Sequence, residues 1–230
     1  MPKFVSFVCQ KGGVGKSTLT KITAAYFNER SVKTLVIDSD YPQHSLAKQR
    51  NQDLLGLSKS GSDMPSDVEL EKWGINPYAI INSDVRSTIS QMDILRSSGE
   101  YKFVFIDLPG TLNIDGISKV IQNLDTIIVP CELEANNIGA AMETVKAIRK
   151  FNKTVPIGFL WSRPDKIHSV KDREAVEAII KKRIDVYFFE YIAYKNKSFN
   201  TANTLNPSPK IVYPFISELA NFMNSLEPVH

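Results

Sequence analysis

The chain has few of the residues that would cross-link it or anchor it in a membrane. Only two of its 230 residues are cysteines, Cys9 and Cys131, and each lies in an apolar run. This excludes a disulfide-built scaffold and favours a reduced, intracellular setting. No apolar stretch approaches the roughly 18 residues of a membrane-spanning helix, and the apolar run at the N-terminus is too short for a signal peptide. We therefore expect a soluble, cytoplasmic protein.

Histidine is also scarce. His44, His168 and His230 are scattered and share no metal-ligand spacing, so we expect surface or capping roles for them. The composition, 43% hydrophobic and 23% charged, is that of an ordinary globular protein, which excludes global disorder.

The net charge of +3 conceals an uneven distribution. Residues 1–142 carry 14 Lys and Arg against 16 Asp and Glu, whereas residues 143–210 carry 14 against 7, a net of +7. A basic block in a near-neutral chain indicates either a surface that faces a polyanion or simply solvated helix faces.

Apolar runs alternate with helical patterns along the chain. We expect strands over residues 3–9, 34–38, 78–81, 103–107, 126–130, 157–161 and 186–191. We expect helices over residues 17–28, 84–97, 115–123, 138–151, 170–183 and 215–226. Continuous Val, Ile and Phe runs between helices are typical of a mostly parallel sheet covered on both faces. The sequence therefore predicts a doubly wound α/β fold that forms a single domain over residues 1–230.

Residues 51–76 depart from this rhythm. Their first half is rich in Gly, Ser and Asp, and Ser66 with Glu69 has the form of a capping box. We expect an irregular excursion with one short helix, whose role the sequence leaves open between a surface insertion and a functional segment.

The strongest motif runs from Gln10 to Thr18, between a predicted strand and a predicted helix. A phosphate chain binds where backbone N–H groups, a helix N-terminus and a cation converge. Lys16 can reach the β- and γ-phosphates, and the Ser17 hydroxyl can hold Mg²⁺. The pattern predicts an ATP-binding loop made of Lys11, Gly12, Gly13, Val14, Gly15, Lys16, Ser17 and Thr18.

The loop departs from the ordinary Walker A pattern, because Gln10 stands where the first glycine would be and a second lysine, Lys11, follows it. In this it resembles the ParA/MinD family of deviant Walker A ATPases, and within that family the ParA-type partition ATPases. The resemblance implies a P-loop NTPase that forms a homodimer around ATP, in which Lys11 contacts the partner's nucleotide. The alternative is that Lys11 is a solvated loop lysine.

Two carboxylates, Asp38 and Asp40, follow a predicted strand at the end that borders the phosphate crevice. Asp38-Ser-Asp40-Tyr-Pro-Gln43 resembles the second acidic motif of the family, although Tyr41 interrupts it. The resemblance implies that Asp40 positions or activates the attacking water and that Asp38 lies near hydrated Mg²⁺. The alternative is a turn in which both side chains cap local N–H groups.

Asp107 ends the apolar run Phe103–Ile106 and is followed by Leu-Pro-Gly110. A rigid strand that presents one acid to Mg²⁺ is what a Walker B aspartate requires. The alternative is an acid that merely ends a strand in a turn. The sequence shows no arginine placed as a catalytic finger and no strong base, which predicts slow hydrolysis. The resemblance implies that a partner, such as a ParB-like protein, stimulates it.

The basic block supplies candidate DNA contacts, because nonspecific DNA binding requires cations spaced over phosphates. By charge alone these are Lys181, Lys182, Arg183, Lys195 and Lys197. The resemblance implies nonspecific DNA binding and an association with the nucleoid. Alternatively, residues 181–183 only stabilise a helix C-terminus.

We expect a slow, dimerising ATPase that acts in DNA partition, such as that of a plasmid or other mobile element. The first alternative is a MinD-like positioning switch that acts on a protein or membrane cargo, although no Lys or Arg follows Lys210 to form a basic membrane-binding tail. The second is a metabolic P-loop enzyme, which would not need Lys11. Trp161 is either a purine contact or a core residue.

Overall fold

Short runs rich in Val, Ile, Leu and Phe form the strands, and four of the seven are buried along their whole length. The computed structural model describes residues 1–58, 63–162, 170–190, 202–205 and 210–225. Its strands are β1 (Lys3–Phe7), β2 (Thr34–Asp38), β3 (Ala79–Asn82), β4 (Phe103–Asp107), β5 (Thr126–Cys131), β6 (Ile157–Trp161) and β7 (Tyr187–Phe188).

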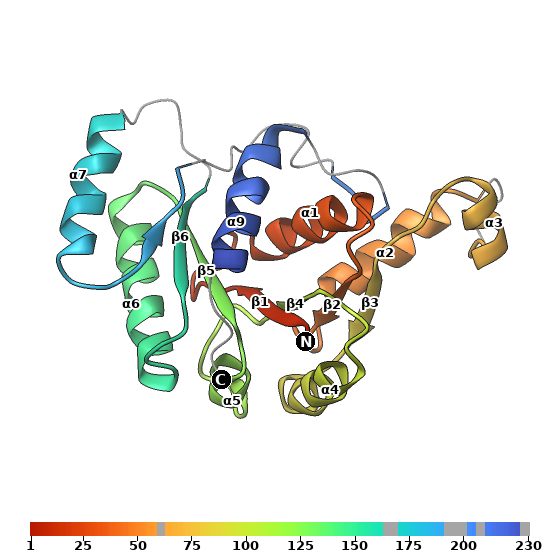
Figure 1. The fold of residues 1–230 in the computed structure, drawn as a ribbon, viewed down its shortest axis with the longest axis horizontal. Coiled ribbons are helices and arrows are strands. Elements are labelled where there is room, and N and C mark those ends of the chain that lie inside the picture. The colour runs from red at the N-terminus through yellow and green to blue at the C-terminus, as the bar shows by residue number, and fades with distance from the viewer. Residues whose placement is uncertain (59–62, 163–169, 191–201, 206–209, 226–230) are drawn as a thin grey trace.

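These strands form one seven-stranded sheet in the order β3-β2-β4-β1-β5-β6-β7, and every pair is parallel. Strand β1 lies at the centre, with β2 and β3 on one side of it and β5 to β7 on the other (Figure 1). The chain thus reverses its direction of winding next to β1, and ligands of open α/β sheets bind at the carboxyl edge beside such a point.

The helices cover both faces of the sheet (Figure 1). They are α1 (Lys16–Glu29), α2 (Ser45–Leu55), α3 (Asp67–Lys72), α4 (Val85–Ser98), α5 (Ile117–Gln122), α6 (Ala135–Phe151), α7 (Val170–Lys181) and α9 (Tyr213–Ser225), with a short 3₁₀ turn at Lys210–Val212. Among the described residues, no helix combines the length and the apolarity that a membrane crossing requires.

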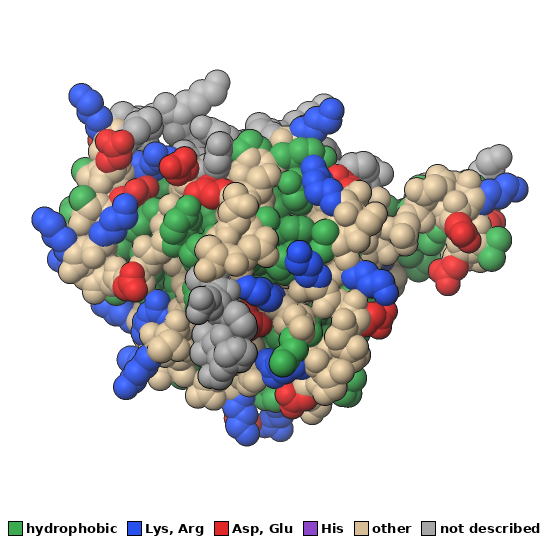
Figure 2. All heavy atoms as spheres, in the orientation of Figure 1, with side chains coloured by type: hydrophobic (Ala, Val, Ile, Leu, Met, Phe, Trp, Pro, Cys, Tyr) green, Lys and Arg blue, Asp and Glu red, His purple; other side chains and the backbone are tan. Residues whose placement is uncertain are grey.

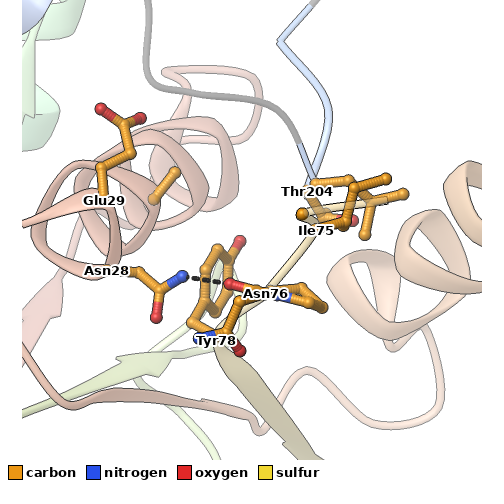
Figure 3. A pocket seen from close by; sticks show the side chains of 10 residues that line it. Asn28, Glu29, Ile75, Asn76, Tyr78 and Thr204 are labelled. Atoms are coloured by element: carbon orange, nitrogen blue, oxygen red, sulfur yellow. Dashed lines mark hydrogen bonds between the residues drawn. The ribbon is translucent and has the colours of Figure 1, made fainter. Parts of the chain in front are cut away.

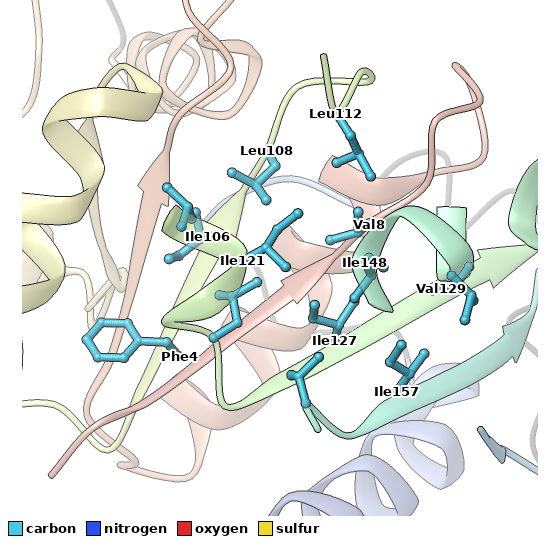
Figure 4. Packing of buried hydrophobic residues seen from close by; sticks show 14 of the residues in the cluster. Phe4, Val8, Ile106, Leu108, Leu112, Ile121, Ile127, Val129, Ile148 and Ile157 are labelled. Atoms are coloured by element: carbon cyan, nitrogen blue, oxygen red, sulfur yellow. The ribbon is translucent and has the colours of Figure 1, made fainter. Parts of the chain in front are cut away.

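Two hydrophobic clusters hold the layers together. One lies between the sheet and α4, α5, α6 and α7, and Figure 4 shows its centre, where Ile106, Ile127 and Ile157 from three strands meet Ile121 and Ile148 from two helices. The other lies between the opposite face and α1, α2 and α9. Burial on both faces explains why the strands are continuous apolar runs rather than alternating ones.

Most predicted elements are confirmed, and the strands over 34–38, 103–107 and 157–161 match residue for residue. Helix α2 was not expected, because Leu46 is its only buried residue and the sequence there has no apolar periodicity. Helix α6 begins at Ala135 rather than Ile138, and β7 is only two residues long.

The excursion over residues 51–76 begins as the end of α2 and contains α3, which lies apart from the sheet (Figures 1 and 2). The capping box is confirmed: Ser66 Oγ accepts from the Glu69 N–H at 3.4 Å and the Glu69 carboxylate accepts from the Ser66 N–H at 2.9 Å. Leu70 is buried beneath the helix, whereas Val68 and Trp73 are exposed.

Gly158 in β6 permits a close approach that no side chain could share. A Cβ at this position would lie 2.3 Å from Phe189 Cε2 and 2.8 Å from its Cζ. Phe189 cannot move aside cheaply, because it is fully buried against Phe215 and Phe222.

We therefore expect Gly158→Ala to lower the free energy of unfolding by about 1–3 kcal/mol, the usual cost of overpacking. Chemical denaturation measures this change in the free energy of unfolding. Gly139→Ala is the control, since a Cβ at that position meets nothing within 4 Å. An unchanged midpoint for Gly158→Ala would contradict this account of the packing.

Candidate functional site

The loop between β1 and α1 is shaped by glycines in the left-handed region. Gly13 has φ 77° and Gly15 has φ 91°, and added Cβ atoms on Gly12 or Gly13 would have no neighbour within 4 Å. Gly15 precedes α1 with no side-chain cap, and the first turn holds no acidic residue. The first backbone N–H groups of the helix are thus free of side-chain acceptors, which is the arrangement that binds phosphate.

Lys16 is the first residue of α1 and lies among the acids of the neighbouring strands. Its ammonium interacts electrostatically with Asp40 and with Asp107, and its Nζ lies 3.7 Å from where a Cβ on Gly110 would stand. The loop after β1 and the loop after β4 therefore meet at this lysine, because these two strands are neighbours in the sheet.

Asp107, at the end of β4, is a fully buried acid, and neither of its carboxylate oxygens has a hydrogen-bond partner. Burial raises its pKa to about 7, and the nearby charge of Asp38 adds to the effect. The nearby Ser17 hydroxyl and the Lys16 charge lower the pKa of Asp107 in part. The Ser17 hydroxyl is nevertheless not within hydrogen-bond geometry of either Asp107 oxygen.

Unpaired buried carboxylate oxygens are costly, so this position fits a bound cation. No group of three or more His, Cys, Asp or Glu in the described part of the chain is arranged to hold a metal unaided. Magnesium in nucleotide sites needs only one or two protein carboxylates, because phosphates and water supply the other ligands.

We expect the nucleotide-free Asp107→Asn variant to have a higher free energy of unfolding than the unmodified chain at pH 8. The difference between the two should be smaller at pH 5. The pKa is higher in the folded chain than in the unfolded one, so the folded state retains a proton that the unfolded state releases between pH 3.8 and about 7. The free energy of unfolding therefore falls as pH rises across this window, by at most about 4 kcal/mol at 1.36 kcal/mol per unit.

Thermal melting of the nucleotide-free protein at the two pH values measures this difference. Asp93→Asn serves as the control, because Asp93 is exposed on α4. Equal changes at pH 5 and pH 8 would contradict the buried, unpaired state of Asp107.

Asp38, at the end of β2, is buried and already occupied. Its Oδ2 accepts from the N–H groups of Leu46 and Ala47, each at 3.0 Å, in the first turn of α2. Its Oδ1 is less engaged, since it receives a long contact from the Asp40 N–H at 3.4 Å and lies 3.9 Å from His44 Nδ1. The structure thus gives Asp38 the local capping role that the sequence left open beside a magnesium role.

Asp40 is half-buried and its side chain is not involved in a comparable cap. Burial raises its pKa, and the Asp38 carboxylate adds to this, whereas Lys16 and His44 lower it. A carboxyl with a raised pKa that lies beside Lys16 is suited to holding a water molecule. His44 stands at the N-cap position of α2, but its side chain does not cap the helix: its Nδ1 lies 3.2 Å from the Asp38 carbonyl oxygen instead.

The second loop lysine is held by a helix that sequence reasoning did not connect with the loop. Lys11 Nζ donates to Asn137 Oδ1 on α6, and the Gln10 N–H donates to Thr144 Oγ1 at 3.1 Å. Asn137 and Thr144 are both buried, in line with the apolar residues Ala141, Val145 and Ile148. Polar residues on the buried face of a helix were the available signal.

The predicted basic residues lie partly inside the described chain. Lys181 ends α7, pairs weakly with Glu177 at 3.8 Å and lies 5.1 Å from the Phe188 ring centre. Lys182 and Arg183 follow it and are exposed. Lys195 and Lys197 fall outside the described residues. Figure 2 shows Lys and Arg side chains over α6 and α7, interspersed with acids.

Trp161 is a core residue. It is 2% exposed, its indole N–H donates to Glu177 at 2.8 Å, and its ring packs against Phe159 and Phe188. This leaves no free face for a purine. Cys9 and Cys131 are likewise buried and free, as the sequence predicted.

A pocket of about 330 Å³ opens at the opposite end of α1 (Figure 3). Asn28, Asn76, Tyr78 and Thr204 line it, and the Asn28 amide donates to the Asn76 carbonyl at 2.6 Å. Because α1 has 14 residues, the pocket lies about 20 Å along the helix from the loop between β1 and α1. It is therefore separate from the candidate nucleotide site.

The sequence profile of the CobQ/CobB/MinD/ParA nucleotide-binding domain matches residues 5–205. The chain belongs to this family. The match covers the loop, the strands from within β1 to β7 and the acidic residues described above, and it confirms the resemblance to the ParA/MinD ATPases.

Solved structures of the family have the same fold. MinD of Aquifex aeolicus, in a MinC:MinD cell division complex, has a TM-score of 0.68 at 17% identity, over 99% of this chain and 98% of that one. A plasmid partition protein of Borrelia burgdorferi bound to AMPPNP has a TM-score of 0.63 at 19% identity, over 98% and 99%. The predicted doubly wound P-loop fold is thereby confirmed.

Matches to curated relatives cover less of the chain than the solved structures do. An uncharacterized protein of Methanocaldococcus jannaschii is 25% identical over 198 residues, which are 70% of this chain and 73% of that protein. Maintenance of carboxysome distribution protein A of Gloeobacter kilaueensis is 26% identical over 63% of this chain, and the match spans 56% of its own length. The match to ATPase ARSA1 of Chlamydomonas reinhardtii, 28% identical over 58% of this chain, spans only 15% of that protein.

Proposed function

We propose that this ParA/MinD-family protein is a slow, Mg²⁺-dependent ATPase, working as a single domain, that dimerises around ATP and partitions DNA. The observation that carries the proposal is the loop itself, in which an uncapped helix N-terminus and Lys16 stand beside two acids with raised pKa values, with a second lysine at the loop's edge. The chain also shares its fold with a plasmid partition protein whose structure was solved with AMPPNP bound.

In this proposal the backbone N–H groups of residues 12–18 and the Lys16 ammonium bind the phosphate chain. Ser17 and Asp107 hold Mg²⁺, which supplies positive charge to the phosphates, and Asp38 contributes through its less occupied Oδ1. Asp40 orients the attacking water. Lys11 completes the site from the partner subunit, so each active site requires the dimer.

Slow turnover follows from what surrounds the phosphates. Phosphoryl transfer depends on positioning and charge neutralisation, and among the described residues the cation that acts on both Asp40 and Asp107 is Lys16. A partner protein that completes the site would accelerate hydrolysis, as the family resemblance implies for a ParB-like protein.

The proposal of DNA binding rests on the exposed basic residues at the C-terminal end of α7 and just after it. We expect the dimer to bind DNA with little sequence preference, because paired patches neutralise more phosphates and add avidity. Replacing Lys181, Lys182 and Arg183 with Ala should weaken DNA binding about tenfold or more. The slope of log affinity against log salt should flatten by about 0.9 for each phosphate that the variant no longer neutralises.

Fluorescence anisotropy with a labelled duplex, with and without ATP at two salt concentrations, measures both effects. Replacing Lys33, Lys72 and Lys102 with Ala changes the net charge equally on other exposed parts of the chain and is the control. If the 181–183 variant binds like the unmodified protein, these residues serve only as a helix C-terminal cap.

The second candidate is a MinD-like switch that positions a protein or membrane cargo without DNA. The likeness to MinD in its complex with MinC favours it. The same anisotropy experiment separates the two, since unmodified protein that ignores DNA at low salt with ATP would support the switch.

A further inference from the structure

The Asn137 amide links the second loop lysine, Lys11, to two acidic side chains. Its Oδ1 accepts from the Lys11 ammonium, and its Nδ2 donates to the Glu132 carboxylate at 2.7 Å and to Glu134 at 3.3 Å. An ammonium only donates and a carboxylate only accepts, so these partners fix the orientation of the amide. Asn137 is 2% exposed, which makes the contact part of the packed end of α6.

A second observation places Lys11 at the same spot. Burial raises the pKa of the Cys131 thiol at the end of β5, and the Lys11 charge offsets part of this rise. The adjoining Gln10 N–H is fixed to Thr144 on α6. The first residues of the loop therefore lie against β5 and α6 of their own subunit.

We propose that Asn137, oriented by Glu132, is a positioning residue that holds Lys11 on its own subunit and must release it when Lys11 contacts the nucleotide of the partner. We call Lys11, Asn137 and Glu132 the lysine latch. The inference rests on the proposed dimer, because the nucleotide of the partner subunit is the competing ligand for which Lys11 would leave Asn137.

The latch opposes dimerisation to the extent that its hydrogen bond must be broken. Lys11 is partly solvent-exposed, so we assign this contact the net value of a typical protein hydrogen bond, about a five- to tenfold change in an equilibrium constant. Two latches open per dimer, so removing both should tighten nucleotide-bound dimerisation by roughly 25- to 100-fold.

The first experiment tests the latch in the nucleotide-free monomer. The full chain is treated briefly with acetic anhydride, and acetylation of Lys11 is quantified by mass spectrometry against exposed Lys72 in the same sample. Asn137→Ala should acetylate Lys11 at least fivefold faster, and Glu132→Gln should give an intermediate rate. The control is Asn136→Ala, because Asn136 is the exposed neighbour on the same helix. Equal Lys11 rates in all variants would overturn the latch.

The second experiment measures dimerisation by sedimentation velocity with AMPPNP and Mg²⁺ over a dilution series. Asn137→Ala should dimerise at lower protein concentration than unmodified protein and Asn136→Ala. An unchanged or weaker dimer with a normal melting temperature would mean that Asn137 does not restrain Lys11. If no variant dimerises while Lys11 acetylation still responds to Asn137→Ala, the dimer fails and the positioning by Asn137 stands.

Discussion

Lys16→Ala should lose at least 100-fold in ATP affinity. Lys16 stands at the first position of α1 and interacts with Asp40 and Asp107, which surround the phosphate position. Its loss removes the main cation on the β- and γ-phosphates and leaves these acids facing the phosphate charge. A charge-assisted hydrogen bond of roughly 3 kcal/mol corresponds to more than a 100-fold change in affinity.

Isothermal titration with AMPPNP and Mg²⁺ measures this affinity. Lys72→Ala is the matched control, since Lys72 lies on exposed α3 far from the loop. The nucleotide-free melting temperature of Lys16→Ala checks that the variant folds. It should change little at pH 5, where the buried Asp107 carboxyl is largely protonated and Lys16 has less negative charge to offset. Near-normal ATP affinity in Lys16→Ala would refute the phosphate-loop assignment.

The sheet could be predicted because its strands are buried on both faces. Runs such as 103–107 are continuously apolar and end at a charged residue, which fixes their boundaries. Helix α2 could not be predicted in the same way, since it buries only Leu46 and its first turn is capped by the Asp38 carboxylate. The Asp38 carboxylate binds the N–H groups of Leu46 and Ala47, eight and nine positions along the chain, and such a contact leaves no periodic pattern in the sequence.

The site was predictable where one segment carries the chemistry and less so where segments meet. The glycines, Lys16 and Ser17 lie in one stretch, and the positive φ angles at Gly13 and Gly15 follow from the sequence. The occupation of Asp38 depends on where α2 begins, and the contact of Lys11 with Asn137 joins residues 126 positions apart. Such contacts are set by the tertiary fold, which the motif alone does not specify.

The ATP-bound dimer should persist when Asp40 is replaced by Ala. Asp40 is the half-buried acid beside Lys16 whose side chain is free to hold water, unlike Asp38, which caps α2. Losing a group that positions or activates the attacking water slows hydrolysis by roughly 100-fold or more. ATP binding should be retained, because Lys16 and the loop remain, and one carboxylate fewer faces the phosphates.

Sedimentation velocity with ATP and Mg²⁺ over time distinguishes the outcomes. Unmodified protein should dimerise on addition of ATP and return to monomer as ATP is consumed, whereas Asp40→Ala should remain dimeric about 100-fold longer, in line with the slower chemistry. Asp63→Ala, which removes an exposed acid from the excursion, should follow the unmodified protein. Lys11→Ala combined with Asp40→Ala should lower the dimer population again, because the bridging lysine is gone. Monomers throughout, in both unmodified protein and Asp40→Ala, would rule out a dimer that forms around ATP and leave the phosphate loop to act within one subunit.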